Sequence, residues 1–333
     1  MSQTNVDYRD SDRQVWCEEL DEFVPARIFD AHIHLFRRAD FATLSPRVKN
    51  RSDADLVTLN DWARTLYPNR KMGYLILGMP LPGIDVARHV TFVKSQIKGH
   101  SNVRYNRLVT PSCKLEDIDR DLQTPGIIGL KPYRLFATSG DVNECRIEEF
   151  LTHEQMAYAN DRGLWVTMHL SRFHGCADKH NLDDLEEYTT KRYPNIKWIL
   201  AHCARSFTYW PIRNAIERLR DMPNIHYDTS AVTDVRPYIT LLTMENPKRI
   251  FFGTDGVSAA FFHGRYVALG RAWQHYDADA GDLKFAHCDG RPILSVYEQL
   301  LSMKHAAEIA ELSRDDVEGI FWNNAATALG LEE

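Results

Sequence analysis

The sequence predicts an α/β protein, a distorted (β/α)8 TIM barrel, because eight short apolar runs alternate with helical patterns along its 333 residues. Several runs are apolar at consecutive positions, such as residues 74–77, which is typical of parallel strands covered on both faces. A chain of this length could also hold two domains, but no shift in composition marks a second one. The predicted strands span residues 27–34, 71–78, 103–110, 126–133, 164–170, 197–203, 224–230 and 250–256.

Two helices between and after these strands are predicted most clearly. Residues 212–219 carry apolar side chains at the i, i+3, i+4 and i+7 positions of one helix face, directly behind Pro211. The final helix has an apolar stripe within residues 317–329, with Ser313 as its N-cap and Gly330 at its C-terminal end.

The predicted barrel occupies residues 25–333 as a single domain, preceded by an N-terminal extension of residues 1–24. Two connections are longer than a simple link requires, namely residues 35–52 and 276–291. Both are expected to lie near the mouth of the barrel, where they could cover an active site.

Composition excludes several classes of function. The net charge of -6 and the absence of a basic run argue against a nucleic-acid partner. No apolar run is long enough for a signal peptide or a membrane span, so we expect a cytoplasmic protein without a membrane partner. Six scattered cysteines without a C-x-x-C pair indicate reduced thiols. The N-terminal extension and the long loops are compatible with a homodimer.

Polar side chains gather where the predicted strands end. His32 and His34 lie two residues apart in the first strand, so both imidazoles point to the same face. The fourth, fifth, sixth and eighth strands end in Lys131, His169, His202 and Asp255. Because barrel enzymes place their chemistry at the carboxyl ends of the strands, these residues predict one site at the rim.

The motifs at these positions resemble those of the amidohydrolase superfamily, and in particular its amidohydrolase-2 branch. They are F-D-A-H-I-H at 29–34, G-L-K-P at 129–132, V-T-M-H at 166–169, I-L-A-H at 199–202 and F-G-T-D at 252–255, with I-F-W-N-N-A at 320–325. The resemblance covers roughly residues 25–330. This branch includes zinc decarboxylases related to aminocarboxymuconate semialdehyde decarboxylase, together with lactonases and hydratases.

The resemblance implies that His32, His34, His169 and Asp255 are metal ligands and that His202 is a catalytic acid/base beside the metal. Three imidazoles and a carboxylate suit Zn²⁺, and other divalent ions such as Mn²⁺ remain open. Such an ion lowers the pKa of its bound water toward about 7. Asp255 would either ligate the ion or accept a proton from that water.

Lys131 leaves the number of metal ions open. In binuclear relatives a lysine at this position is carboxylated and bridges two ions, whereas in mononuclear ones it is structural or a cationic substrate contact. We expect one ion. With two ions His202 would become a ligand, and the acid/base role would fall to Asp255.

Arginines also gather after the strand ends, at positions 37, 38, 134, 172, 205 and 236. Guanidinium groups bind carboxylates at two points, so we expect a small substrate that bears a carboxylate. Arg134 and Arg172 are the best candidates because each lies within three residues of a predicted site residue, and His174 is a further candidate for substrate binding. Asp228, at the end of the seventh strand, is either structural or a partner of a ligand histidine.

Three activities follow from this reasoning. The first is a metal-dependent hydrolase that cleaves an amide or lactone bond with metal-activated water. The alternative is a non-oxidative, zinc-dependent decarboxylase, and the second alternative is a metal-independent lactonase. A binding protein without turnover is disfavoured, because every predicted ligand and the acid/base histidine are present.

Overall fold

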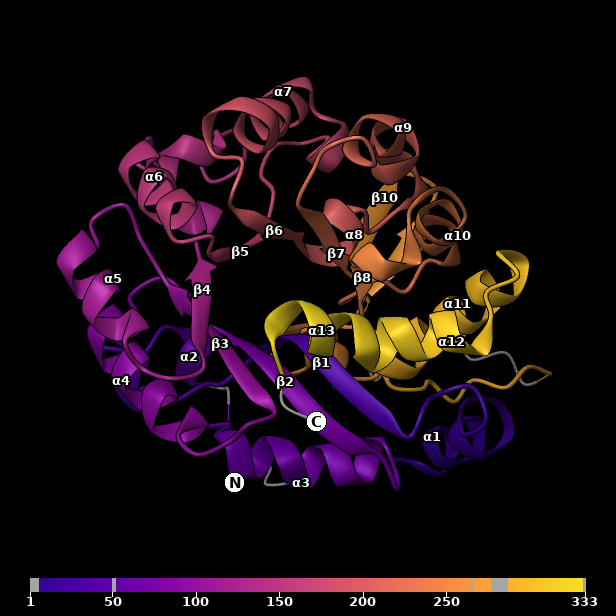
Figure 1. Ribbon diagram of the computed structural model, residues 1–333. Helices are drawn as coiled ribbons and strands as arrows, with labels where there is room; N and C mark the ends of the chain where they lie inside the picture. The colour runs from indigo at the N-terminus through magenta and orange to yellow at the C-terminus, as the bar shows by residue number, and fades with distance from the viewer. Residues whose placement is uncertain (1–5, 50–51, 265, 277–286, 332–333) are drawn as a thin grey trace.

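A computed structural model describes residues 6–49, 52–264, 266–276 and 287–331 of the chain. Eight parallel strands follow one another around a barrel in chain order (Figure 1). They are β1 Arg27–His34, β2 Lys71–Leu77, β3 Val103–Leu108, β4 Ile127–Lys131, β5 Trp165–Met168, β6 Lys197–Leu200, β7 Ile225–Asp228 and β8 Ile250–Phe251. The predicted distorted (β/α)8 barrel is confirmed.

The barrel closes between its first and last strands. The N–H of Ala31 donates to the carbonyl of Phe252 (2.8 Å), and the N–H of Asp255 donates to the carbonyl of His32 (2.7 Å). The later strands are shorter than predicted, because residues such as His202 and Asp255 leave the extended conformation and take positive φ angles. These residues therefore stand on the rim beyond the sheet.

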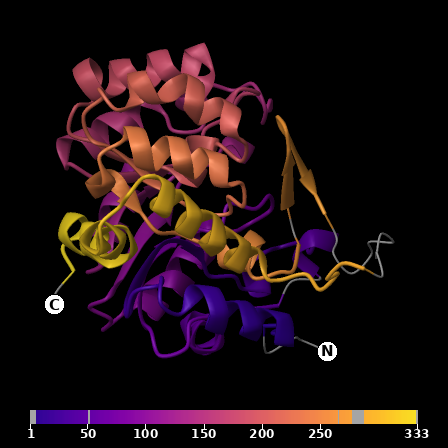
Figure 2. The same cartoon turned by 90° about the vertical axis from the view of Figure 1, so that its right-hand side faces the viewer.

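Helices surround the barrel between successive strands (Figures 1 and 2). The longer ones are α3 Leu56–Leu66, α4 Val86–Ile97, α5 Leu115–Leu122, α6 His153–Asp161, α7 Lys179–Glu187, α9 Tyr209–Leu219, α10 Val235–Met244 and α11 Ser295–Ile309. Shorter segments are α1 Asp10–Val15, η1 Trp16–Leu20, η2 Arg38–Asp40, α2 Pro46–Lys49, η3 Arg134–Phe136, η4 Ile147–Glu149, η5 Gly175–Ala177, η6 Tyr188–Arg192, α8 Ala201–Arg205, η7 Pro247–Arg249 and η8 Gly256–Ala260.

The two predicted helices are present. The expected face of α9 is buried through Ile212, Ala215, Ile216 and Leu219. The final helix divides into α12 Arg314–Glu318, a π-helical turn η9 Gly319–Asn323 and α13 Asn324–Leu329. Ser313 caps its start by accepting the N–H of Asp316, and Gly330 ends it in the left-handed conformation.

The N-terminal segments α1 and η1 lie against the segment before α11 and against α11 itself. Asp12 accepts the N–H of Leu294 (2.8 Å), and the ring of Trp16 lies 5.7 Å from that of Tyr297. No helix within the described ranges is long and apolar enough to cross a membrane. The homodimer and the cytoplasmic location stay predictions from the sequence.

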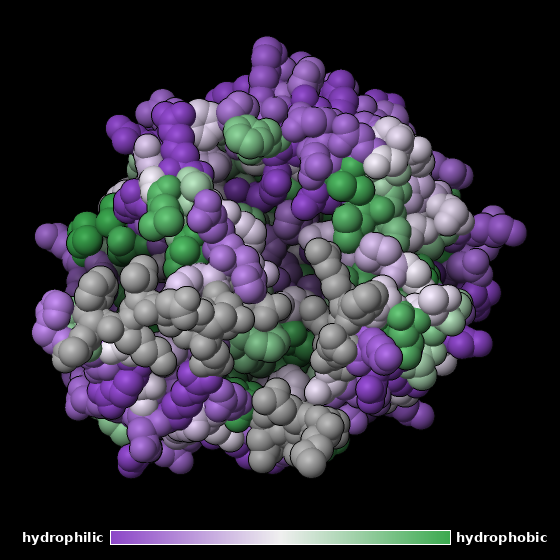
Figure 3. Space-filling model, turned by 180° about the vertical axis from the view of Figure 1, so that it is seen from behind, coloured by the Kyte–Doolittle hydropathy of each residue, from purple (hydrophilic) through white to green (hydrophobic). Residues whose placement is uncertain are grey.

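An antiparallel hairpin, β9 Tyr266–Leu269 and β10 Ala272–His275, follows the eighth strand and was not predicted. It projects from one side of the barrel (Figure 2). Figure 3 views this side, whose surface is hollowed near the centre between hydrophilic and hydrophobic residues. Each of the two connections expected near the mouth contains residues outside the described ranges, namely 50–51 in the first and 277–286 in the second.

Candidate active site

The histidine pair of β1 is held by acceptors at Nδ1. His32 Nδ1 lies 2.8 Å from a carboxylate oxygen of Asp228, and His34 Nδ1 lies 2.9 Å from the carbonyl oxygen of Leu77. A carboxylate and a carbonyl accept hydrogen bonds, so each neutral ring carries its proton on Nδ1 and its lone pair on Nε2. Both rings are buried. The pair is therefore set to offer Nε2 as a ligand atom.

The histidines after β5 and β6 follow the same pattern. His169 Nδ1 lies 2.9 Å from the carbonyl oxygen of Leu170, and His202 Nδ1 lies 3.0 Å from that of Ser230. Burial lowers the pKa of His202 to about 3 and holds that of His169 well below its usual range. Both rings are neutral at pH 7, again with the lone pair on Nε2.

These rings and one carboxylate converge on a single point. The potential ligand atoms of His32, His202 and Asp255 all lie within 4.8 Å of one another. His34 Nε2 lies 3.5 Å from Oδ1 of Asp255, and the ring of His169 lies 5.0 Å from that of His202. The structure thus brings together the five residues that the sequence predicts as ligands or as acid/base. The tightest triad contains His202, for which the sequence predicts the acid/base role.

Asp228 joins three strands beneath this point. One of its oxygens faces His32, and the other accepts the N–H groups of His202 (2.9 Å) and Ser230 (3.1 Å). Burial alone would raise the pKa of Asp228, but the neighbouring His32 and these bonds hold it below its ordinary value. Of the two roles open from the sequence, the geometry matches the partner of a ligand histidine.

The backbone after β6 is strained. Four consecutive residues, His202, Cys203, Ala204 and Arg205, have φ angles of 60, 49, 58 and 60°, and Asp255 has 55°. A left-handed residue other than glycine costs roughly 1–2 kcal/mol. Such strain persists only where the surroundings enforce the conformation, and it concentrates at functional sites. Nothing in the sequence signals this turn, because none of these residues is glycine.

Lys131, at the end of β4, is buried at 1% exposure. Among the described residues its Nζ has no hydrogen-bond partner, and it lies 5.6 Å from the ring centre of Tyr133. Burial lowers the pKa of the amine to about 8. The charges of Asp228 and Asp255 act on this ammonium group, but it lacks the hydrogen-bonded partner that buried charges normally have, so the site can accept an anion or a modified amine.

The arginines divide into two groups. Arg172 pairs with Asp178 (2.7 Å) and with Glu144 (3.2 Å). Three others also pair with carboxylates, in the pairs Arg37–Asp40, Arg38–Asp53 and Arg236–Asp234. These guanidinium groups are already neutralised by the protein.

Arg134 and Arg205 form the second group. Arg134 donates to the carbonyl of Val142 (2.5 Å), and Arg205 donates to that of Arg172. In the part of the chain that the structure describes, neither forms an ion pair with a carboxylate. Burial, and next the charge of Arg134, lower the pKa of Arg205. The ring of His174, the remaining candidate contact, lies 4.9 Å from that of Trp210, tilted by 45°.

Comparison with protein families agrees with this arrangement. A sequence model described as "Amidohydrolase" matches residues 110–331, well over half of the chain. The chain belongs to the amidohydrolase family. A comparison with curated proteins gives no significant match.

Solved structures share the fold of this amidohydrolase at low sequence identity. A candidate 2-pyrone-4,6-dicarboxylic acid hydrolase of Pseudomonas putida has a TM-score of 0.56 at 12% identity, covering 93% of this chain and 100% of its own. A 2,6-dihydroxybenzoate decarboxylase of Rhizobium has 0.55 at 11%, covering 93% and 100%. A dihydroxybenzoic acid decarboxylase of a Polaromonas species, with bound manganese, has 0.53 at 13%, covering 93% and 98%.

The donor set of this amidohydrolase fits a divalent metal ion. Several Nε2 lone pairs and one carboxylate face one another, while the opposite ring nitrogens are fixed by the protein. Imidazole and carboxylate ligands suit Zn²⁺ and are also compatible with Mn²⁺. Both the one-ion and the two-ion arrangement stay open, because each has a role for Lys131, His202 and Asp255.

Proposed function

We propose that this amidohydrolase is a metal-dependent hydrolase that opens a lactone or amide bond in a small carboxylated compound. One observation carries the proposal. Ligand atoms of His32, His202 and Asp255 converge beside cationic side chains that lack a carboxylate partner among the described residues. The first group supplies ligands for a metal ion, with His202 as the acid/base beside it, and the second fits the carboxylate of a substrate.

Each residue of the site has a task in this reaction. A divalent ion, when bound, supplies a Lewis acid at the substrate carbonyl. Asp255 accepts the proton of the attacking water, since its carboxylate faces the converging histidines. His202 Nε2 takes this proton over from Asp255 and passes it to the leaving group. Its Nδ1–H stays bound to the carbonyl of Ser230 throughout, which fixes the ring.

The cationic cluster of Lys131, Arg134 and Arg205 supports a carboxylated substrate. Burial is the largest cause of the lowered pKa of His169, and the charges of all three groups lower it further. Removing such charges from water without a counter-charge is costly, so a bound carboxylate would offset part of that cost. We assign the cluster to substrate binding, with Arg134 as the residue expected from the sequence. The predicted roles of Arg172 and His174 stay open to test.

Decarboxylation is the second candidate. The same cluster could hold the carboxylate that is lost as carbon dioxide, while His202 or Asp255 protonates the carbon left behind. Two structures of similar fold are decarboxylases of dihydroxybenzoic acids, which agrees with this alternative. A metal-independent lactonase is the third candidate, since the hydrolytic proton transfers use Asp255 and His202 themselves.

Three probe compounds, each printed in the name of an enzyme of similar fold, separate these candidates: 2-pyrone-4,6-dicarboxylate, 2,6-dihydroxybenzoate and 5-carboxyvanillate. Each is incubated in oxygen-18 water with protein loaded with Zn²⁺ or Mn²⁺ and with chelator-treated protein, whose metal content is measured. Oxygen-18 in the organic product supports hydrolysis. Carbon dioxide release without label in the organic product supports decarboxylation. Hydrolysis that survives complete metal removal supports the metal-independent lactonase, and no turnover of any probe contradicts this choice of substrate class.

A further inference from the structure

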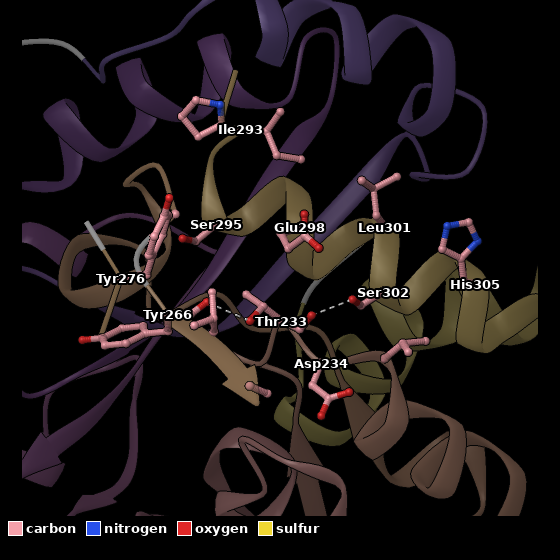
Figure 4. Close-up of a pocket in the computed structure, with 15 residues that line it drawn as sticks. Thr233, Asp234, Tyr266, Tyr276, Ile293, Ser295, Glu298, Leu301, Ser302 and His305 are labelled. Atoms are coloured by element: carbon pink, nitrogen blue, oxygen red, sulfur yellow. Dashed lines mark hydrogen bonds between the residues drawn. The ribbon is translucent and has the colours of Figure 1, made fainter. Parts of the chain in front are cut away.

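The β9–β10 hairpin needs anchors, because an isolated two-stranded hairpin is only marginally stable in water. Strand β10 is exposed at all four positions. At the base of the hairpin, the hydroxyl of Thr233 donates to the carbonyl of Tyr266 (3.2 Å), and the hydroxyl of Ser302 donates to the carbonyl of Thr233 (2.9 Å). Figure 4 shows both bonds in the groove of about 600 Å³ between β9 and α11.

The second anchor is a stack of aromatic rings. Trp273 pairs across the hairpin with Ala268, whose small side chain leaves room for the indole. The indole stacks on Tyr266 at 4.3 Å on one side and on Phe207 at 4.1 Å on the other, with interplanar angles of 26° and 18°. Offset stacked rings contribute about 0.5–1.5 kcal/mol beyond the area they bury.

The stack continues into the active site. The ring of Phe207 lies 5.0 Å from the imidazole of His202, tilted by 33°. A single row of rings therefore runs from the exposed hairpin through Trp273 and Phe207 to His202.

His202 needs such support more than an ordinary rim residue does. It begins the left-handed turn that ends at Arg205, and this turn must be held by its surroundings. Ser230 fixes its ring through Nδ1, and Asp228 fixes its backbone through the N–H, so one edge of the ring is anchored. Phe207 contacts its face, so the stack restricts rotation of the imidazole about its anchored edge.

We propose that Trp273 is a positioning residue that acts through Phe207 on His202, so that the β9–β10 hairpin is part of the active site. The inference rests on the proposed acid/base role of His202. Trp273 does not touch the reacting atoms. It fixes the plane in which His202 Nε2 meets the substrate, and a small displacement of such a group costs about ten- to a hundredfold in rate.

The test compares Trp273→Ala, Trp273→Phe and Gln274→Ala in the full-length, Zn²⁺-loaded protein. Gln274 is the matched control, because it is the next residue of the same exposed strand and points to the opposite face. The indole is 36% exposed, so the barrel should fold without it, which thermal melting checks. Two quantities are measured: the carbon-bound Cε1–H resonance of His202 in carbon-13 histidine-labelled protein, assigned with His202→Asn, and kcat and KM on the active probe.

We expect Trp273→Ala to shift the His202 resonance beyond its linewidth and to lower kcat about tenfold or more, with KM within about twofold. Trp273→Phe should restore most of both, and Gln274→Ala should change neither. The proposal is overturned if Trp273→Ala matches Gln274→Ala in the resonance, or if the resonance moves and kcat does not. If no probe is turned over, the proposed function fails independently, and the resonance alone decides whether the stack positions His202.

Discussion

A carboxylate oxygen of Asp228 lies 2.8 Å from Nδ1 of His32 in the centre of the barrel rim. Its second oxygen accepts the N–H of His202. One buried side chain of β7 therefore fixes both His32, which belongs to β1, and His202, which follows β6. A histidine that donates to a carboxylate is held in one tautomer and becomes a more basic ligand. Asp228 therefore sets the geometry of the proposed metal site without reaching the metal itself.

Replacing Asp228 with Asn should weaken metal binding by about 10–100-fold, because an amide is a poorer acceptor for His32 Nδ1–H. Competition with a chelator under Zn²⁺ buffering measures this affinity. Asp61→Asn serves as the control, since this exposed residue pairs with Arg64 on α3. Equal Zn²⁺ affinity in the two variants would show that Asp228 does not tune the ligand.

A second prediction concerns His202, whose ligand atom lies in the tight triad and whose expected role is acid/base. Asn fits this position, because it tolerates the positive φ angle better than most residues. His202→Asn should retain Zn²⁺ within about tenfold and lose at least about a hundredfold in kcat on the active probe. His305→Asn, an exposed position on α11, should change neither. Loss of the metal from His202→Asn would instead make His202 a ligand.

The strands and the rim residues could be predicted from the sequence because they follow periodic and local rules. Eight apolar runs gave eight strands, and His32 and His34 share a face because side chains alternate along a strand. The motif that contains Asp255 occurs where the eighth strand ends. Closure of the barrel then brought together residues that are distant in the chain.

Other features depend on tertiary contacts and left no local signal. The left-handed turn from His202 to Arg205 contains no glycine, so its conformation is imposed by packing. The β9–β10 hairpin is held by Phe207, which lies more than fifty residues earlier in the chain. Proximity in sequence does not separate Arg172 from Arg205, since each lies three residues after a predicted site histidine, and only the folded chain shows that Asp178 and Glu144 engage Arg172.

A third prediction separates the two arginines. Arg205→Gln should raise KM for a carboxylated probe about tenfold with little change in Tm, because this guanidinium has no ion pair with a carboxylate among the described residues. Arg172→Gln should lower Tm by a few degrees, because it loses partly buried pairs with Asp178 and Glu144, and should leave KM nearly unchanged. A rise in KM for Arg172→Gln would support the substrate role that the sequence predicts for it.

The last prediction concerns the buried amine of Lys131, whose pKa falls from 10.5 to about 8 because burial disfavours its charge. Between these two values the unfolded chain binds more protons than the folded chain, so the free energy of unfolding rises with pH in that window. Below about pH 8 both states are protonated, and the folded state carries the whole cost of burying the charge, on the order of 3 kcal/mol.

Metal-free Lys131→Met should therefore melt above the metal-free parent at pH 7, and the difference in Tm should shrink toward pH 10. The same variant should lose turnover of a carboxylated probe, as expected where stability is sacrificed for a binding site. A lower Tm for Lys131→Met at pH 7 would mean that the amine has a stabilising partner, such as Asp228 or Asp255, whose charges oppose the effect of burial on its pKa.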